Sequence, residues 1–295
     1  MQTIMKNFLI WLAAILITLT AAVYQRMTGP TYPRRDTVEV NGVAYKIKLV
    51  RSLGLDERPV VRLAVYDTTV TAKLFYKRFR TGGEYTETEF RYRVIPVSSF
   101  IMNKVFGMYE VKGFFASVPQ QPPAGKLQYY IEITDKSGTK TICRDNPVVI
   151  RFKGAVPSWI LTPHIILMFL AMLLSTLAGI MAAAGHRLFR RYAVWTLALL
   201  TAGGMVLGPL VQYYAFGDLW TGVPFGWDLT DNKTLIAFLF WILAVVMNRK
   251  KERPLYTILA SVILLLVYSI PHSMLGSELD YESGKVIQGY LGCIF

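Results

Sequence analysis

Long runs of uncharged, mostly apolar residues occupy the start of the chain and its second half. Nineteen uncharged residues separate Lys6 from Arg26. Four further runs follow, at about 158–184, 192–216, 231–248 and 255–272. Runs of ~20 apolar residues are needed to cross the ~30 Å hydrocarbon core of a bilayer. The pattern predicts five transmembrane helices, with an anchor in residues 1–26 and a four-helix bundle in residues 157–273.

The first run has a second interpretation, as a cleaved signal peptide. Lys6 would supply the basic start of such a peptide, and Thr20-Ala21-Ala22 would supply a cleavage site of small residues. The apolar region of a signal peptide normally spans ~7–15 residues, which is shorter than this run. We therefore expect a retained anchor.

Small residues recur at regular spacing in the second and third runs. Four of them are found at every fourth position of the second run, and two in the third run have GxxxG spacing. These residues are Ala171, Ser175, Gly179 and Ala183, and Gly204 and Gly208. On a helix they form a ridge that lets a neighbouring backbone approach closely. We expect the second and third runs to form a tightly packed helical hairpin.

Between the first two runs, apolar and polar positions alternate with a period of two. The stretches Tyr45–Leu49 and Leu127–Ile133 show this pattern, which is typical of half-buried strands. Clusters of turn-forming residues, such as those at 81–83 and 121–125, separate the strands. About seven short strands in ~115 residues predict an all-β sandwich domain in residues 36–152.

Two segments of this domain, Phe115–Pro119 and Pro122–Gly138, resemble the last strands of bacterial immunoglobulin-like and fibronectin-type-III-like domains. The resemblance implies that fold together with a binding or spacer role, and no catalysis. The paired cysteines of antibody domains are missing, because Cys143 stands alone in the domain. Cys293 lies far along the chain, so two free thiols and a bridge between the two cysteines both remain open.

Composition places the chain in the membrane class. Only 17% of the residues are charged and 53% are apolar, with a mean hydropathy of +0.37, which excludes an ordinary soluble enzyme. Lysine and arginine concentrate in the short links 185–191 and 249–254, and such residues are retained in cytoplasmic loops. We therefore expect the N-terminus inside a bacterial cytoplasmic (inner) membrane. Residues 27–157 and the C-terminal tail, 274–295, are expected outside.

The predicted β domain contributes +9 to the formal net charge of +13, because it has 21 basic and 12 acidic residues between positions 34 and 153. Nucleic acid is not an expected partner, because no groove-reading motif accompanies this charge. Anionic lipid headgroups, acidic loops of the same chain and an acidic partner are the alternatives, beside a merely solvated basic surface. The expected partners are the lipid bilayer and a protein outside the membrane.

Two of the three histidines, His164 and His272, fall in the outer leaflet under this topology. An ionisable group within a span suggests a functional site. The two imidazoles could be the axial ligands of a b-type haem, or two ligands of a divalent metal. The carboxylates that would complete the metal site are Asp228, Glu278 and Asp280. In the alternative interpretation, each histidine donates a hydrogen bond to a backbone carbonyl near Pro163 or Pro271, where proline supplies no N–H to the helix.

The link between the third and fourth runs contains three glycines together with Trp220, Phe225 and Trp227. Such aromatic residues suit the headgroup layer, so we expect the loop to lie folded on the membrane surface. We also expect Asp231 or Thr230 to cap the fourth helix. A further hypothesis is an outer-face polar cluster. Its members would be Asp228, Asp231, Asn232, Lys233, His272 and Glu278.

This loop supports two resemblances. Its Trp227-Asp228 pair, with histidines nearby, is similar to the haem-handling loop of cytochrome c assembly proteins, although those proteins carry several tryptophans in close succession. Residues 220–226 (WTGVPFG), 228–234 (DLTDNKT) and 270–281 (IPHSMLGSELDY) resemble segments of an uncharacterised family of bacterial multi-pass membrane proteins. The second resemblance covers nearly the whole chain, and it implies the architecture derived above without adding an activity.

Motifs of several enzyme classes are missing from the sequence, which has no phosphate loop, dinucleotide-binding turn, HExxH or CxxC pair. Ser273 or Ser277 beside His272 does not define a nucleophilic triad, and the five runs show no inverted repeat typical of transporters. We therefore predict a non-enzymatic envelope protein with an extracytoplasmic binding or assembly domain. The alternative is a haem- or metal-binding redox membrane protein that uses His164 and His272.

Overall fold

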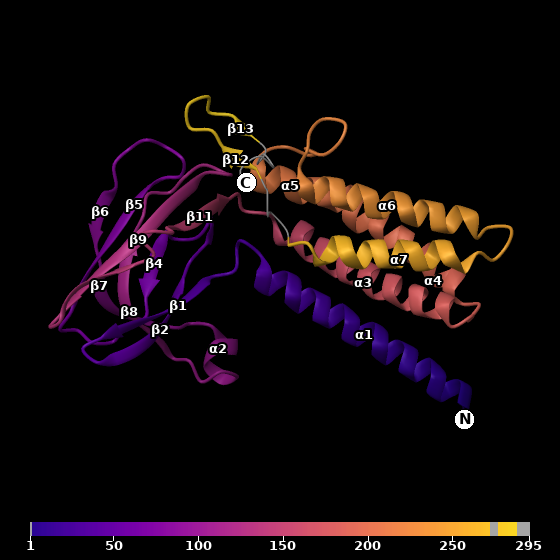
Figure 1. The fold of residues 1–295 in the computed structure, drawn as a ribbon, viewed down its shortest axis with the longest axis horizontal. Coiled ribbons are helices and arrows are strands. Elements are labelled where there is room, and N and C mark those ends of the chain that lie inside the picture. The colour runs from indigo at the N-terminus through magenta and orange to yellow at the C-terminus, as the bar shows by residue number, and fades with distance from the viewer. Residues whose placement is uncertain (1, 272–276, 288–295) are drawn as a thin grey trace. The chain divides into compact units, whose positions relative to one another are not determined.

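The computed structural model describes residues 2–271 and 277–287, and the chain divides into two compact units. The helical unit takes in residues 1–30 and 155–295, and the β unit takes in residues 31–154 (Figure 1). Each unit has its own hydrophobic core. The predicted combination of apolar helices with separate β-sheets is therefore confirmed.

The described part of the helical unit consists of apolar helices and one short hairpin. Its elements are α1 (Gln2–Thr28), α3 (Ser158–Ala183), α4 (Phe189–Leu200), the π-helical segment η1 (Thr201–Leu207), α5 (Gly208–Phe216), α6 (Leu229–Met247), α7 (Pro254–Ser269), β12 (Glu278–Leu279) and β13 (Val286–Ile287). Four helical segments are long and apolar enough to cross a membrane, namely Ile4–Thr28, Ser158–Ala183, Phe189–Phe216 and Leu229–Met247. Helix α7 is apolar but shorter, with 16 residues.

Helix α3 is the element against which α1, α4 and α7 all pack. Ile10 and Ala14 of α1 are buried in one cluster with Leu177 of α3. Near the other end of α1, the side-chain amide of Gln25 donates a hydrogen bond of 2.7 Å to the carbonyl of Tyr268 in α7. Helix α1 is therefore joined to the other helices near both of its ends.

The small residues of α3 and η1 allow close approach to different neighbours. A Cβ atom on Gly203 would lie 2.9 Å from the Cβ atom of Leu167, so η1 packs tightly on α3. A Cβ atom on Gly179 would lie 2.6 Å from the Cβ atom of Ser261 in α7. The predicted helical hairpin is present, but the close contact at Gly179 is made to α7. Regular spacing of small residues defines a face of a helix and does not identify its neighbour.

Strands from three sheets share one core in the β unit. The strands are β1 (Arg34–Val40), β2 (Val43–Leu49), β3 (Ser52–Gly54), β4 (Val60–Leu63), β5 (Thr71–Arg78), β6 (Thr86–Glu89), β7 (Arg91–Pro96), β8 (Glu110–Ser117), β9 (Lys126–Asp135), β10 (Gly138–Ile142) and β11 (Val148–Lys153), with the short helix α2 (Phe100–Lys104) between β7 and β8. The largest sheet has the order β3-β11-β9-β5-β6, with β10 also paired to β9, and the others are β4-β8-β7 and β1-β2.

The predicted alternation of buried and exposed side chains is found in the strands. Ile47 and Leu49 of β2 are buried, as are Leu127, Ile131 and Ile133 of β9. Eleven strands occur in residues 31–154, all of which the structure describes, whereas about seven were predicted. The excess includes very short strands, because β3 has three residues and β6 has four, too few for an alternating pattern to be recognised.

Asp135 joins the β9–β10 turn to the β1–β2 turn. Its Oδ1 atom accepts hydrogen bonds from the amide and the hydroxyl of Ser137. Its Oδ2 atom accepts a hydrogen bond of 3.0 Å from the Asn41 amide and one of 3.2 Å from the Lys140 ammonium. The Ser137 hydroxyl, followed by the Asn41 amide, holds the pKa of Asp135 well below its usual range.

This shift predicts an acid-sensitive β unit. The pKa of Asp135 is lower in the folded state than the ~3.9 of an unfolded chain, so its stabilising effect is present above that pH and is lost as the pH falls further. We expect the melting temperature of Asp135→Asn to fall less between pH 5 and pH 2.5 than that of the unsubstituted chain. Circular dichroism melts in detergent measure this, with the exposed Asp145→Asn as control. Equal pH slopes for Asp135→Asn and the unsubstituted chain would contradict it.

Candidate functional site

Part of the predicted outer-face polar cluster lies at the start of α6. The helix begins at Leu229, and Asp228 is its N-cap. The carboxylate of Asp228 accepts hydrogen bonds of 2.8 Å from the Thr230 amide and 3.2 Å from the Asp231 amide. The prediction that Asp231 or Thr230 caps this helix is therefore wrong. Both residues lie in the first turn, where their amides need the cap.

Asp231 instead holds the preceding loop against α6. Its Oδ2 atom accepts hydrogen bonds from the Thr221 amide (2.7 Å), the Gly222 amide (3.1 Å) and the Gln212 side-chain amide (3.0 Å), and from the Thr221 hydroxyl (3.3 Å). The residue is 6% exposed. A carboxylate with several hydrogen-bond donors can remain buried at low cost. Asp231 thus connects the end of α5, the loop and the start of α6.

Two further contacts fix the same loop. The side-chain oxygen of Asn232 accepts a hydrogen bond of 2.7 Å from the Val223 amide, and the indole N–H of Trp220 donates one of 3.1 Å to the Val223 carbonyl. Gly222 approaches α6 closely, since a Cβ atom there would lie 2.7 Å from the Cβ atom of Asp231. On this fixed loop, Phe225 is 80% exposed and Trp227 is 81% exposed.

Lys233 connects α6 to α7. Its side chain is buried, and its ammonium donates a hydrogen bond of 2.6 Å to the carbonyl of Ile270, just after the last turn of α7. The last carbonyls of a helix lack partners within the helix and carry partial negative charge. A lysine placed there satisfies one of them and holds the two helix ends together.

The remaining members of the predicted cluster and metal site lie elsewhere or outside the described residues. Glu278 is buried in β12. Asp280 shapes the turn that follows, because its carboxylate accepts hydrogen bonds from the Ser283 hydroxyl and the Glu282 amide. The Ser283 bond lowers the pKa of Asp280. His272 lies outside the described residues.

His164 bonds to a backbone carbonyl. Its Nδ1 atom lies 2.9 Å from the carbonyl oxygen of Gly203, so Nδ1 is the donor. The same carbonyl accepts the Gly208 amide in the widened turn of η1. Pro209 follows at the start of α5, where a regular α-helix would bring its ring against the carbonyl of Met205. The proposed alternative named a carbonyl near Pro163, but the acceptor belongs to the neighbouring helix.

The haem and metal hypotheses cannot be built from the described residues alone, because the partner His272 lies outside them. Within residues 2–271 and 277–287, no group of three or more His, Cys, Asp or Glu side chains is arranged to hold a metal ion. Cys143 is a free thiol, 3.7 Å from the carboxylate of Asp36. Cys293 lies outside the described residues.

The β unit carries a second candidate site that the sequence analysis does not predict. Between β7 and β8 the chain makes an excursion, residues 97–109, which contains α2 and which we call the apolar knob (Figure 1). Its large apolar side chains are between 41% and 74% exposed. They are Phe100, Ile101, Met102, Val105, Phe106, Met108 and Tyr109. Exposed apolar surface of this kind is typical of protein or membrane interaction sites.

Hydrogen bonds close the apolar knob at its base. The Val97 amide donates one of 2.8 Å to the carbonyl of Tyr109, next to the last pair of the β7–β8 ladder. The side-chain amide of Asn103 donates one of 2.9 Å to the carbonyl of Val97, and the Met108 amide donates one of 2.9 Å to the carbonyl of Met102. The exposed side chains therefore stand on a fixed frame.

A groove of about 740 Å³ lies beside the apolar knob. Its walls include Tyr66, Val94 and residues 106–112. Arg62 also lines the groove, and its guanidinium donates a hydrogen bond of 2.8 Å to the carbonyl of Lys112. The Lys112 ammonium lies 3.5 Å from the Glu110 carboxylate. Aromatic, methionine and arginine side chains are enriched in protein interfaces, so this surface suits a protein partner.

The sequence does contain a signal for the apolar knob. Residues 100–109, FIMNKVFGMY, include seven large apolar residues without the period-two alternation of a half-buried strand. The loop that Asp231 holds against α6 leaves a weaker signal in the sequence, because Gln212, Thr221 and Asp231 are brought together only by the fold. The chain matches no family model, no curated protein and no solved structure.

Proposed function

We propose that the chain is an integral membrane protein with five spans, formed by α1, α3, α4 to α5, α6 and α7. Length and apolar character support four of these spans, and the apolar character of the shorter α7 supports the fifth. Exposed apolar side chains such as Leu16, Val194 and Leu266 support the proposal as well. The basic links 185–191 and 249–254 support a cytoplasmic position for both. Residues 27–157 and the C-terminus would then lie outside a bacterial inner membrane.

The contacts of α1 support a retained anchor rather than a cleaved signal peptide. Cleavage after Ala22 would remove Ile10 and Ala14 from their cluster with α3, and it would expose Leu177 and Phe189, which are buried in the same cluster. Between helices in a bilayer, such contacts stabilise through van der Waals packing. Retention of α1 therefore stabilises the bundle.

The proposed function is that of a non-enzymatic envelope protein, in which an immunoglobulin-like β sandwich binds or assembles a protein partner outside the membrane. The observation that carries this proposal is the apolar knob. Seven large apolar side chains stand exposed on a hydrogen-bonded frame, beside a groove whose charged lining is Arg62, Lys112 and Glu110. Burying them is favourable only in a complex, because the folded domain leaves them in water.

The arrangement at the start of α6 supports a structural role for the bundle. Asp231 is engaged by four donors of the loop and of α5, and Lys233 by the end of α7. These groups fix an aromatic loop whose Phe225 and Trp227 suit the headgroup layer. The helical unit would thus be a rigid anchor from which the β unit engages its partner.

A double substitution in the apolar knob tests this function. Ile101→Ser with Phe106→Ser removes two exposed side chains, and such surface changes alter stability by about 0.5 kcal/mol or less. Anchoring side chains at an interface contribute more than ~1 kcal/mol each. We therefore expect at least a tenfold lower ratio of cross-linked partner to tagged chain after purification from native membranes. Quantitative mass spectrometry measures this ratio.

Val43→Ser is the matched control, because Val43 is 52% exposed in a different hairpin of the same unit. The control variant is expected to recover the partner as well as the unsubstituted chain does. Equal recovery by the double variant and the control variant would contradict the assignment of the apolar knob as the binding surface.

A further inference from the structure

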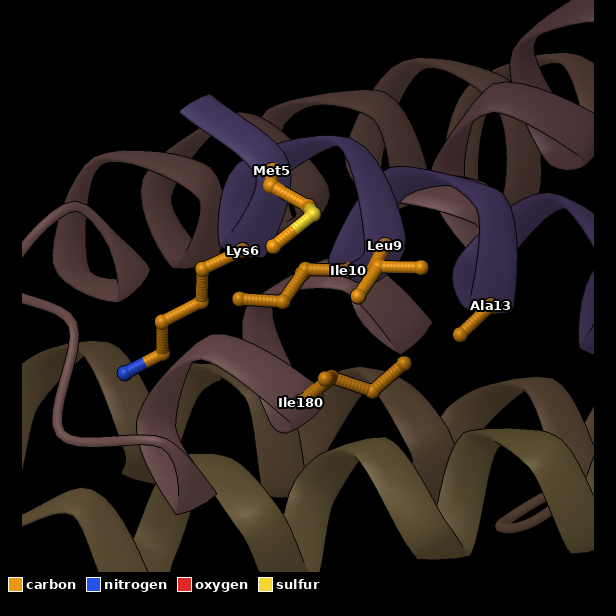
Figure 2. A pocket seen from close by; sticks show the side chains of 6 residues that line it. All are labelled: Met5, Lys6, Leu9, Ile10, Ala13 and Ile180. Atoms are coloured by element: carbon orange, nitrogen blue, oxygen red, sulfur yellow. The ribbon is translucent and has the colours of Figure 1, made fainter. Parts of the chain in front are cut away.

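An open groove of about 410 Å³ lies between helices α1 and α3 (Figure 2). Met5, Leu9 and Ala13 follow one another at four-residue spacing along one side of α1, and Lys6 and Ile10 do so beside them. Figure 2 shows Ile180 of α3 facing this row across the gap, with Lys6 at one end and Ala13 at the other. The groove is therefore an open, apolar furrow between the two helices, with the Lys6 side chain at one end.

The Lys6 ammonium can donate further hydrogen bonds. The Lys6 side chain is exposed, and its ammonium donates one long hydrogen bond, of 3.4 Å, to the carbonyl of Ala184 after the end of α3. An ammonium carries three N–H donors. One such bond leaves two for an anionic oxygen placed at the end of the groove.

Further positive charge lies at the same end of the helical unit. The link that follows α3, residues 185–191, begins beside Lys6. The guanidinium of Arg190 donates a hydrogen bond of 2.8 Å to the carbonyl of Arg249, which joins this link to the second one, residues 249–254. The two links together contain seven basic residues and one acidic residue. An anionic headgroup is attracted to such a surface.

We propose that this groove binds one phospholipid with an anionic headgroup. One acyl chain lies along Leu9, Ile10 and Ala13 against Ile180, and the phosphate accepts hydrogen bonds from the Lys6 ammonium. The volume falls within the ~300–1,000 Å³ range of small-molecule sites, and a lysine with an apolar stem and a charged head suits the boundary of acyl chain and headgroup. This inference rests on the proposed membrane insertion of the helices.

Two substitutions in the full chain test the site. Lys6→Gln removes the charge and is expected to lower retention of phosphatidylglycerol about fivefold. The loss for phosphatidylcholine of the same acyl chains is expected to be smaller, because its choline cation already offsets the attraction of the phosphate to the basic surface. Ala13→Phe fills the groove and is expected to abolish retention of both lipids. The measurement is native mass spectrometry of the detergent-purified chain titrated with each lipid.

The matched controls are Lys251→Gln, an exposed lysine at the same end, and Leu16→Phe, which adds an aromatic ring at a 56% exposed position of α1. Leu16→Phe is expected to bind like the unsubstituted chain. Lys251→Gln removes one charge of the basic links but no residue that lines the groove, so it is expected to lower retention of phosphatidylglycerol by much less than fivefold. The inference is overturned if Ala13→Phe retains as much lipid as Leu16→Phe, or if Lys6→Gln matches Lys251→Gln. Release of the chain from membranes by carbonate would overturn both the proposed membrane insertion and the inference. If the chain stays in the membrane after carbonate treatment and either of these lipid-binding results is found, only the inference is overturned.

Discussion

Replacement of Asp231 by alanine is expected to lower the free energy of unfolding by about 3 kcal/mol or more. The substitution removes the acceptor of the Thr221 and Gly222 amides, whereas the Gln212 side-chain amide keeps its bond of 2.6 Å to the Thr221 hydroxyl. A buried donor that loses its partner costs ~1–3 kcal/mol, and bonds to a charged acceptor are the stronger ones. The loss should appear as a lower midpoint of thermal denaturation in detergent.

The loop itself should report the same change. Without Asp231, the segment from Trp220 to Trp227 keeps the bond from the Val223 amide to Asn232 but loses its other side-chain bonds to α6. We therefore expect it to become more accessible to protease before the helices unfold. Asp218→Ala is the control, because Asp218 is exposed on the same link. If Asp231→Ala melts and resists protease like Asp218→Ala, the loop is not held by this carboxylate.

The second large effect concerns the contact between α3 and α7. Gly179→Ala is expected to destabilise the helical unit by ~1–3 kcal/mol, because the added methyl group would overlap Ser261. Its Cβ atom would lie 2.6 Å from the Cβ atom of Ser261 and also against the Ser261 hydroxyl. The two helices would have to separate, since packing between membrane helices depends on close backbone approach.

A double-mutant cycle isolates this contact. Ser261→Gly removes both atoms that the new methyl group would meet, so it should restore most of the stability lost in Gly179→Ala. The comparison uses thermal midpoints of the two single variants and the double variant in one detergent. Additive losses, with no rescue in the double variant, would show that Gly179 does not face Ser261.

The helices and the alternating strands were predictable because their patterns depend on local properties. A run such as Phe8–Tyr24 is long and apolar whatever surrounds it, and the alternation at Tyr45–Leu49 follows from the geometry of a strand with one buried face. Neither pattern requires knowledge of which elements are neighbours.

The parts that were not predictable depend on tertiary contacts. Asp228, Thr230 and Asp231 are all suitable N-cap residues, and only the path of the loop decides that Asp228 caps the helix while Asp231 binds Thr221. In the same way, the spacing of small residues did not reveal that Gly179 faces α7. The apolar run of residues 100–109 was visible, but its exposure depends on how β7 and β8 pair.

The measurement that most directly tests the central claim is site-specific photo-cross-linking in intact cells. A benzophenone amino acid replaces Phe106 in the apolar knob, and in a separate variant it replaces Val43, which is also exposed in the β unit. We predict a discrete protein adduct from position 106, found in the carbonate-resistant membrane fraction, and none from position 43. Adducts with lipid alone, equal labelling from both positions, or no adduct from position 106 would contradict a membrane-anchored binding module.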